Sequence, residues 1–143
     1  MAELSALSTE LIKKGWKQLE DVEPVLPGMG GNVEYVSFLT GEEEFVSIEQ
    51  LKRRAIIMRA NLGQSDAQWL VDRQEMLSEC PEDVRYLLFP GTVWEHLNDG
   101  RLCPYLYRTG KKEKEWDIYV FWMDFGFSDE HIRLVRLAQV TSP

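Results

Sequence analysis

Four apolar segments in the last third of the chain decide the fold: TVWEHL at 92–97, RLCPYLY at 101–107, WDIYVFWMDF at 116–125 and HIRLVRL at 131–137. Turn-forming residues separate these segments, which is typical of successive antiparallel strands. In the third segment apolar residues occupy both alternating sets of positions, so that both faces of the sheet need a cover. The segments predict an antiparallel meander of about four or five strands, mostly C-terminal.

The first hairpin of this meander can be placed in register from its turn. Asn98-Asp99-Gly100 is a strong turn signal. A two-residue type I′ turn at Asp99-Gly100 pairs His96 with Cys103 and Trp94 with Tyr105. This register and the alternation of the next strand gather an aromatic set of Trp94, Tyr105, Tyr107, Tyr119 and Phe121. Such a set is either packed in the core or free to stack on a ligand.

Helices are expected in the first 90 residues. Residues 4–20 carry leucines, Ile12 and Trp16 at helical spacing. Ser47 and Ser65 are each followed three positions later by a glutamine, which is the pattern of a capping box at a helix start. Residues 82–88 are predicted to add a helical turn. These segments are the natural cover for one face of the sheet.

A loop and a short strand separate the first two helices. The prolines and glycines between 24 and 31 predict a loop, and a β-like run follows at 33–39. The chain is therefore expected to form a single α+β domain over residues 1–143. In it, the antiparallel sheet packs against two or three helices from the N-terminal half.

The charge balance limits the possible partners. The chain has 24 acidic and 16 basic residues, for a formal net charge of −8. Such a surface repels nucleic acids and anionic membranes, and it favours a protein partner with a basic surface. The candidate contact residues are the acidic clusters and the aromatic set: Glu42, Glu43, Glu44, Asp129, Glu130, Trp94, Tyr105, Tyr107 and Tyr119.

The location of the protein is predicted from three negative signals. The chain has two cysteines, too few for a disulfide scaffold, and its N-terminus lacks the features of a secretory signal. No apolar run approaches about 18 residues, the length needed to span a membrane. A cytoplasmic location is therefore expected.

A zinc site is one alternative role. Cys80, His96, Cys103 and His131 are residue types that bind zinc, and two of them face each other in the predicted hairpin register. Their spacing lacks the paired short separations of known zinc sites, and each cysteine precedes a proline where a buried small side chain is the usual role. No cofactor is therefore predicted.

The second alternative is a small hydrolase or metal-dependent enzyme centred on Asp124, Asp129 and His131. Carboxylates beside a histidine can relay a proton or hold a divalent ion. The third is a small-molecule binder that uses the aromatic face. We expect instead a non-catalytic protein-binding module, such as an inhibitor, immunity factor or adaptor. Its oligomeric state stays open.

Overall fold

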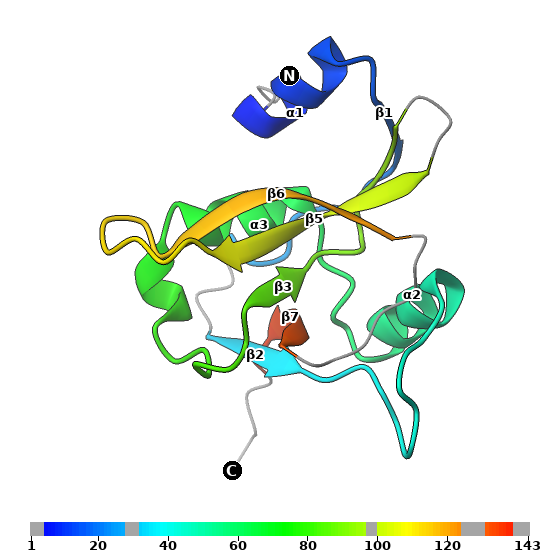
Figure 1. Ribbon diagram of the computed structural model, residues 1–143, viewed down its shortest axis with the longest axis vertical. Coiled ribbons are helices and arrows are strands. Elements are labelled where there is room, and N and C mark those ends of the chain that lie inside the picture. Colours follow the sequence, from blue (N-terminus) through cyan, green and yellow to red (C-terminus); the bar gives the residue numbers. More distant parts are fainter. Residues whose placement is uncertain (1–4, 28–31, 97–99, 124–130, 139–143) are drawn as a thin grey trace.

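Strand β5 (Arg101–Arg108) is the centre of a seven-stranded sheet in the computed structural model (Figure 1), which describes residues 5–27, 32–96, 100–123 and 131–138. The strand order is β1-β4-β5-β3-β7-β2, and β6 pairs with the other edge of β5. The remaining strands are β1 (Lys17–Glu20), β2 (Val33–Val36), β3 (Tyr86–Leu88), β4 (Val93–Glu95), β6 (Trp116–Trp122) and β7 (Ile132–Leu137). The described helices are α1 (Ala6–Lys13), α2 (Ile48–Ile57), α3 (Gln64–Val71) and the 3₁₀ helix η1 (Gln74–Leu77).

The domain is α+β, but its sheet is mixed and is not a pure antiparallel meander. Only β4, β5 and β6 follow the predicted meander, because β7 pairs parallel with β3 and antiparallel with β2. Leu134 and Val135 explain this position: they point to opposite faces, and both have 0% exposure. A strand with apolar side chains on both faces is favoured in the interior of a sheet that is covered on both sides. Strand β2 confirms the β-like run expected there.

The helical turn predicted at 82–88 is wrong, because its second half forms β3. Leu87 pairs with Leu106, and Leu88 pairs with Tyr105, both in antiparallel register. Leu87 and Leu88 are fully buried on opposite faces of the sheet. Alternating burial of neighbouring residues is a property of strands, so tertiary packing overrides the local preference here.

The sheet's two faces are covered by different helices. Ala67, Leu70 and Val71 of α3 pack against Leu87 and other residues of one face. Leu51 and Ala55 of α2 pack on the opposite face. Helix α1 closes a third cluster over the β4–β5–β6 end of the sheet, and Figure 1 shows it beside β1, far from α2. Each face of the sheet is thus covered in part by helices of the same chain.

The hairpin register predicted from the turn is wrong by three residues. Trp94 pairs with Leu102, not with Tyr105, and the His96 N–H donates to the Gly100 carbonyl. A shift by an odd number reverses the faces, so that Trp94 lies with Leu102 under α1, away from Tyr105. Asn98 and Asp99 of the predicted turn lie outside the described residues.

The polar atom of Trp94 explains why this register is preferred. The Trp94 side chain is 1% exposed, and its indole N–H donates to Gln64 Oε1 at 2.8 Å. The Gln64 amide group in turn donates to Ser8 Oγ at 2.7 Å and Ser5 Oγ at 3.1 Å. One buried amide therefore joins α1, α3 and β4, and it satisfies an indole N–H that would be unpaired on burial.

The helix starts were predicted with mixed success. The capping box of α2 is confirmed: Ser47 Oγ accepts from the Gln50 N–H, and the Gln50 side chain accepts from the Ser47 N–H. The box predicted at Ser65 is wrong. Helix α3 starts two residues earlier than predicted, with Gly63 as its N-cap, and the Gln64 N–H donates to Thr92 Oγ1 at 2.8 Å.

The N-terminal helix is shorter than the predicted span of 4–20. It begins after its N-cap Ser5 and ends at Lys13. Gly15 then takes a φ of 86°, and the chain turns into β1. A glycine with positive φ is a usual helix stop. None of the described helices is long and apolar enough to span a membrane.

Candidate protein-interaction surface

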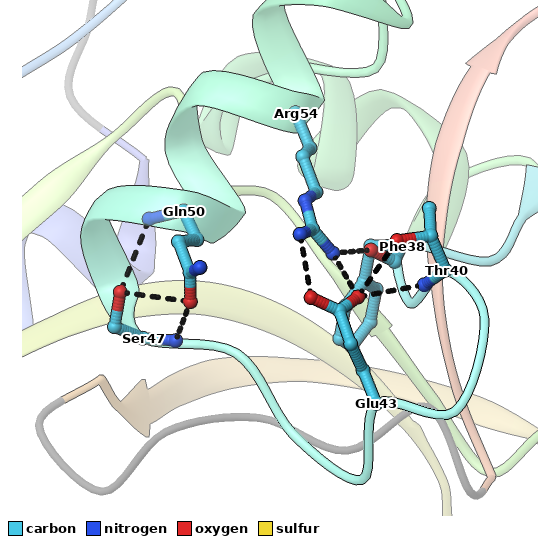
Figure 2. A network of polar contacts seen from close by, with 6 residues as sticks. All are labelled: Phe38, Thr40, Glu43, Ser47, Gln50 and Arg54. Carbon is cyan, nitrogen blue, oxygen red and sulfur yellow. Dashed lines mark hydrogen bonds and ion pairs between the residues drawn. The ribbon is translucent and has the colours of Figure 1, made fainter.

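The acidic cluster at Glu42, Glu43 and Glu44 lies on a loop between β2 and α2 (Figure 2). We call residues 40–45 the acidic loop. Phe38 before the loop and Val46 after it are both 1% exposed and belong to the core cluster under α2. The loop thus leaves and re-enters the core at two fixed points. Gly41 takes a φ of 59°, which turns the chain at the tip.

Glu43 holds the loop against α2. Its two carboxylate oxygens accept from Arg54 Nη1 at 2.6 Å and Nη2 at 2.8 Å. Oε1 also accepts from the N–H and the hydroxyl of Thr40, while Arg54 Nη1 donates to the Phe38 carbonyl at 2.9 Å. Figure 2 shows Arg54 reaching from the helix to this carboxylate. A bidentate pair fixes both distance and orientation.

The hydrogen bonds to Glu43 also change its acidity. The Arg54 guanidinium, followed by the Thr40 N–H and hydroxyl, lowers the pKa of the Glu43 carboxyl to about 2. The same pair raises the pKa of Arg54. Glu43 is therefore charged at every physiological pH, and its charge is neutralised within the loop. Among the three glutamates of the acidic loop, Glu43 is thus the one that is held by partners within the protein.

Glu42, Glu44 and Phe45 are the outward part of the acidic loop. Both glutamates are exposed, and neither forms an ion pair within the part of the chain that the structure describes. The Phe45 ring is 66% exposed, more than any other aromatic side chain among the described residues. A phenyl ring left in water on a loop with two exposed glutamates has no role in packing, since the core begins only at Val46.

The aromatic face of the sheet is a second surface. Tyr105 lies 5.8 Å from Tyr86, 5.4 Å from Tyr107 and 5.3 Å from Phe121 between ring centroids. Tyr119 lies opposite Tyr105 on β6. All five rings are partly exposed, and Tyr86 is 37% exposed. Burial raises the pKa of Tyr105. Trp94 does not belong to this face.

A groove beside β6 continues from two of these tyrosines. It has a volume of about 390 Å³, and α1, α3 and β6 supply its walls. Tyr107 and Tyr119 line it together with Glu10, Asp72 and Asp117. Lys114 also lines it, within 3.2 Å of Asp117. Tyr119 is held at the rim by Lys14, whose Nζ donates to the tyrosine hydroxyl at 3.2 Å.

The four candidate zinc ligands are not brought together. Cys80 and Cys103 belong to core clusters on opposite faces of the sheet, and His96 lies between the rings of Trp16 and Trp122. Burial raises the pKa of Cys80 to about 11 and that of Cys103 to about 12, so both thiols stay protonated. Within residues that the structure describes, no three His, Cys, Asp or Glu side chains converge.

The residues of the enzyme hypothesis lie mostly beyond the described segments. Asp124, Asp129 and Glu130 fall outside the described residues, so their arrangement is not stated. His131 is described: it has a φ of 67°, and its Nδ1 lies 2.7 Å from the Asp83 carbonyl oxygen. A backbone carbonyl fixes the ring at the start of β7, which is a structural contact.

Two residues of interest were not singled out from the sequence. Phe45 lies between the three glutamates and the buried Val46. Its only signal in the sequence is that an apolar residue directly follows an acidic run. Tyr86 was assigned to a helical turn, so its place beside Tyr105 could not be foreseen. A comparison with protein-family models, with curated proteins and with solved structures found no match.

Proposed function

We propose that the chain is a non-catalytic protein-binding module that engages a basic partner surface through the acidic loop. The observation that carries this proposal is the 66% exposed Phe45, which follows the exposed Glu42 and Glu44 on a loop fixed by the Glu43–Arg54 pair. An exposed aromatic ring is the usual anchor of a protein interface, and nearby charges speed the encounter of oppositely charged partners.

The fixed loop supports this role energetically. Ordering a loop during association opposes binding, by roughly 0.5–1.5 kcal/mol for each immobilised side chain. Here Arg54 and Thr40 hold the loop before a partner arrives, and buried Phe38 and Val46 fix its ends. The partner is then expected to present lysines or arginines around an apolar pocket that accepts the ring of Phe45.

The experiment is affinity capture from a native lysate with quantitative mass spectrometry. We expect one basic protein to be enriched by the wild type and lost with Phe45→Ala. It should be weakened by the double change Glu42→Gln and Glu44→Gln. The matched control is Ile12→Ala, because Ile12 is a 50% exposed apolar residue on a different element. Glu43 is left unchanged, since its replacement would disturb the loop.

The captured partner is then tested in purified form. Its affinity should fall with rising salt, because surface charges are screened within about 10 Å at 0.1 M ionic strength. The double glutamine variant should show a flatter salt dependence. Equal capture of the same proteins by the wild type and Phe45→Ala would contradict the proposal. So would hydrolytic activity in a substrate screen that is lost with Asp124→Asn.

The aromatic face supports a second candidate, the binding of a small molecule. Tyr86, Tyr105 and Phe121 form a connected set of partly exposed rings with centroid distances of 5.3 to 6.3 Å. A ligand that stacks there should quench tyrosine fluorescence in the wild type and lose affinity with Tyr86→Ala. Phe45→Ala should leave that binding unchanged, which separates the two candidates.

A further inference from the structure

A cavity lies beyond the C-terminal end of α2. Its volume is about 800 Å³, within the range of sites for small organic molecules. Val25, Leu62, Leu137 and Ala138 supply apolar wall, and the polar lining residues are Arg59, Asn61 and Arg136. Two arginines and no carboxylate line it among the described residues, although the chain as a whole carries a net charge of −8.

Arg59 occupies a backbone position that favours glycine. The end of α2 forms a Schellman motif, in which the Ala60 N–H donates to the Ala55 carbonyl and the Arg59 N–H to the Ile56 carbonyl. Arg59 has the left-handed conformation of this motif, with a φ of 59°. Any residue with a Cβ is strained there, and strain of this kind is concentrated at functional sites. The arginine side chain therefore calls for an explanation other than folding.

The two arginines of the cavity have different surroundings. Arg136 donates from Nε to Glu34 at 2.8 Å and from Nη1 to the Met58 carbonyl at 3.1 Å. These bonds fix its guanidinium between β2 and the end of α2. Arg59 is exposed and forms no ion pair or side-chain hydrogen bond within the described part of the chain. One cation is thus held in place at the cavity, and the other is free to meet a ligand.

Asn61 adds a third polar group. Its Oδ1 atom is shielded from solvent and has no hydrogen-bond partner among the described residues. An unpaired acceptor that is cut off from water is unfavourable, by about 1–3 kcal/mol in general. The same shielding keeps this oxygen from a ligand in the cavity, so the two arginines supply the polar contacts there.

We propose that this cavity binds a small amphipathic anion. Its carboxylate or phosphate group lies against Arg59 and Arg136, and its apolar body lies along Leu62 and Leu137. Guanidinium groups favour these anions because their N–H groups match two oxygens at once. This site is independent of the acidic loop, and its proposal does not rest on the protein-binding function.

The test uses anilinonaphthalene sulfonate, an anion with an apolar ring system, as a fluorescent probe. Arg59→Gly should weaken probe binding about tenfold, the loss expected for one charge-assisted contact. It should also raise the melting temperature by roughly 2–4 °C, because glycine relieves the strained φ. Arg59→Ala should weaken binding equally without that rise. If Arg59 had only a structural role, Arg59→Gly would not lose affinity for the probe while its melting temperature rises.

Two further arms make the outcome decisive. Arg53→Gln is the control, because Arg53 is an exposed arginine of α2 that does not line the cavity. It should bind the probe like the wild type. Displacement of the probe by laurate or by naphthyl phosphate then identifies a carboxylate or a phosphate head group, and dodecyltrimethylammonium should displace nothing. Absence of probe binding, unchanged affinity in Arg59→Gly, or an equal loss in Arg53→Gln would overturn the proposal.

Discussion

The loop before α2 and the cavity after it carry opposite charges. In the loop, Glu43 is neutralised by Arg54 from the last turn of α2, while Glu42 and Glu44 point to solvent. At the cavity, Arg136 is held by Glu34, while Arg59 forms no ion pair among the described residues. Each surface thus has one paired charge that fixes the backbone and at least one unpaired charge. Residues of the same type therefore differ here in whether a partner holds them.

The largest effect is expected from removing the charge that pairs with Glu43. Arg54→Gln loses both bonds to Glu43 and the bond to the Phe38 carbonyl, so the acidic loop loses its attachment to α2. We expect the free energy of unfolding in urea to fall further than in any other variant below. The amides of residues 40–45 should also exchange faster with deuterium. An unchanged exchange rate would remove the distinction between Glu43 and its neighbours.

The second prediction concerns the helix start beside the loop. Ser47→Ala should lower the free energy of unfolding by about 1 kcal/mol, the usual effect of a lost N-cap. Ser65→Ala is the matched control and should change it by less than about 0.5 kcal/mol, because Ser65 is an exposed residue inside α3. Urea unfolding of both variants measures the difference. Equal losses would show that Ser65 caps α3 after all.

The third prediction uses the acidity of Glu43. Its pKa is lowered in the folded protein to about 2 from an ordinary value of 4.5, so the ion pair stabilises the fold above about pH 4.5. That contribution is lost as the pH falls through about 2. The stability difference between wild type and Glu43→Gln should therefore shrink from pH 5 to pH 2. Asp66, whose pKa burial raises, titrates in both proteins and cancels. A difference that stays constant over this range would contradict the pairing.

The smallest effect is expected from the unpaired charges of the loop. Glu42→Gln and Glu44→Gln should each change the free energy of unfolding by less than about 0.5 kcal/mol, because exposed side chains without partners contribute little to stability. Thermal unfolding at low salt checks this. A marked destabilisation by either variant would give that glutamate a structural role and weaken its assignment to a partner.

Local signals in the sequence predicted what local contacts determine. The α2 start was readable because Ser47 and Gln50 satisfy each other within one turn. The α3 start was not, because its cap comes from Thr92, 28 positions away from Gln64. The hairpin register failed for the same reason: the turn residues favoured one pairing, but the indole of Trp94 required Gln64. A partner this distant in the sequence gives no signal in the residues next to the one that it contacts.

The candidate sites follow the same rule. The acidic cluster was visible as a composition, but the pairing of Glu43 depends on Arg54, eleven positions further on, and on the loop between them. The strain at Arg59 is a backbone property that no residue pattern encodes, since most helices place glycine there. The charge of a site could thus be predicted from the sequence. Which of its charged side chains form ion pairs could not.

The Gln64 amide also sets the order in which the molecule assembles. Helix α1 has eight residues, too few to be stable alone in water. Its buried Ser8 and Leu11 contact Gln64 and Trp94, which lie 56 or more positions later in the chain. The docking surface for α1 exists only after α3 and β4 have met, so α1 is expected to be the last of the described helices to dock. It is also expected to be the first to open in a thermal fluctuation, and a protease that cuts near Gly15 would report that opening.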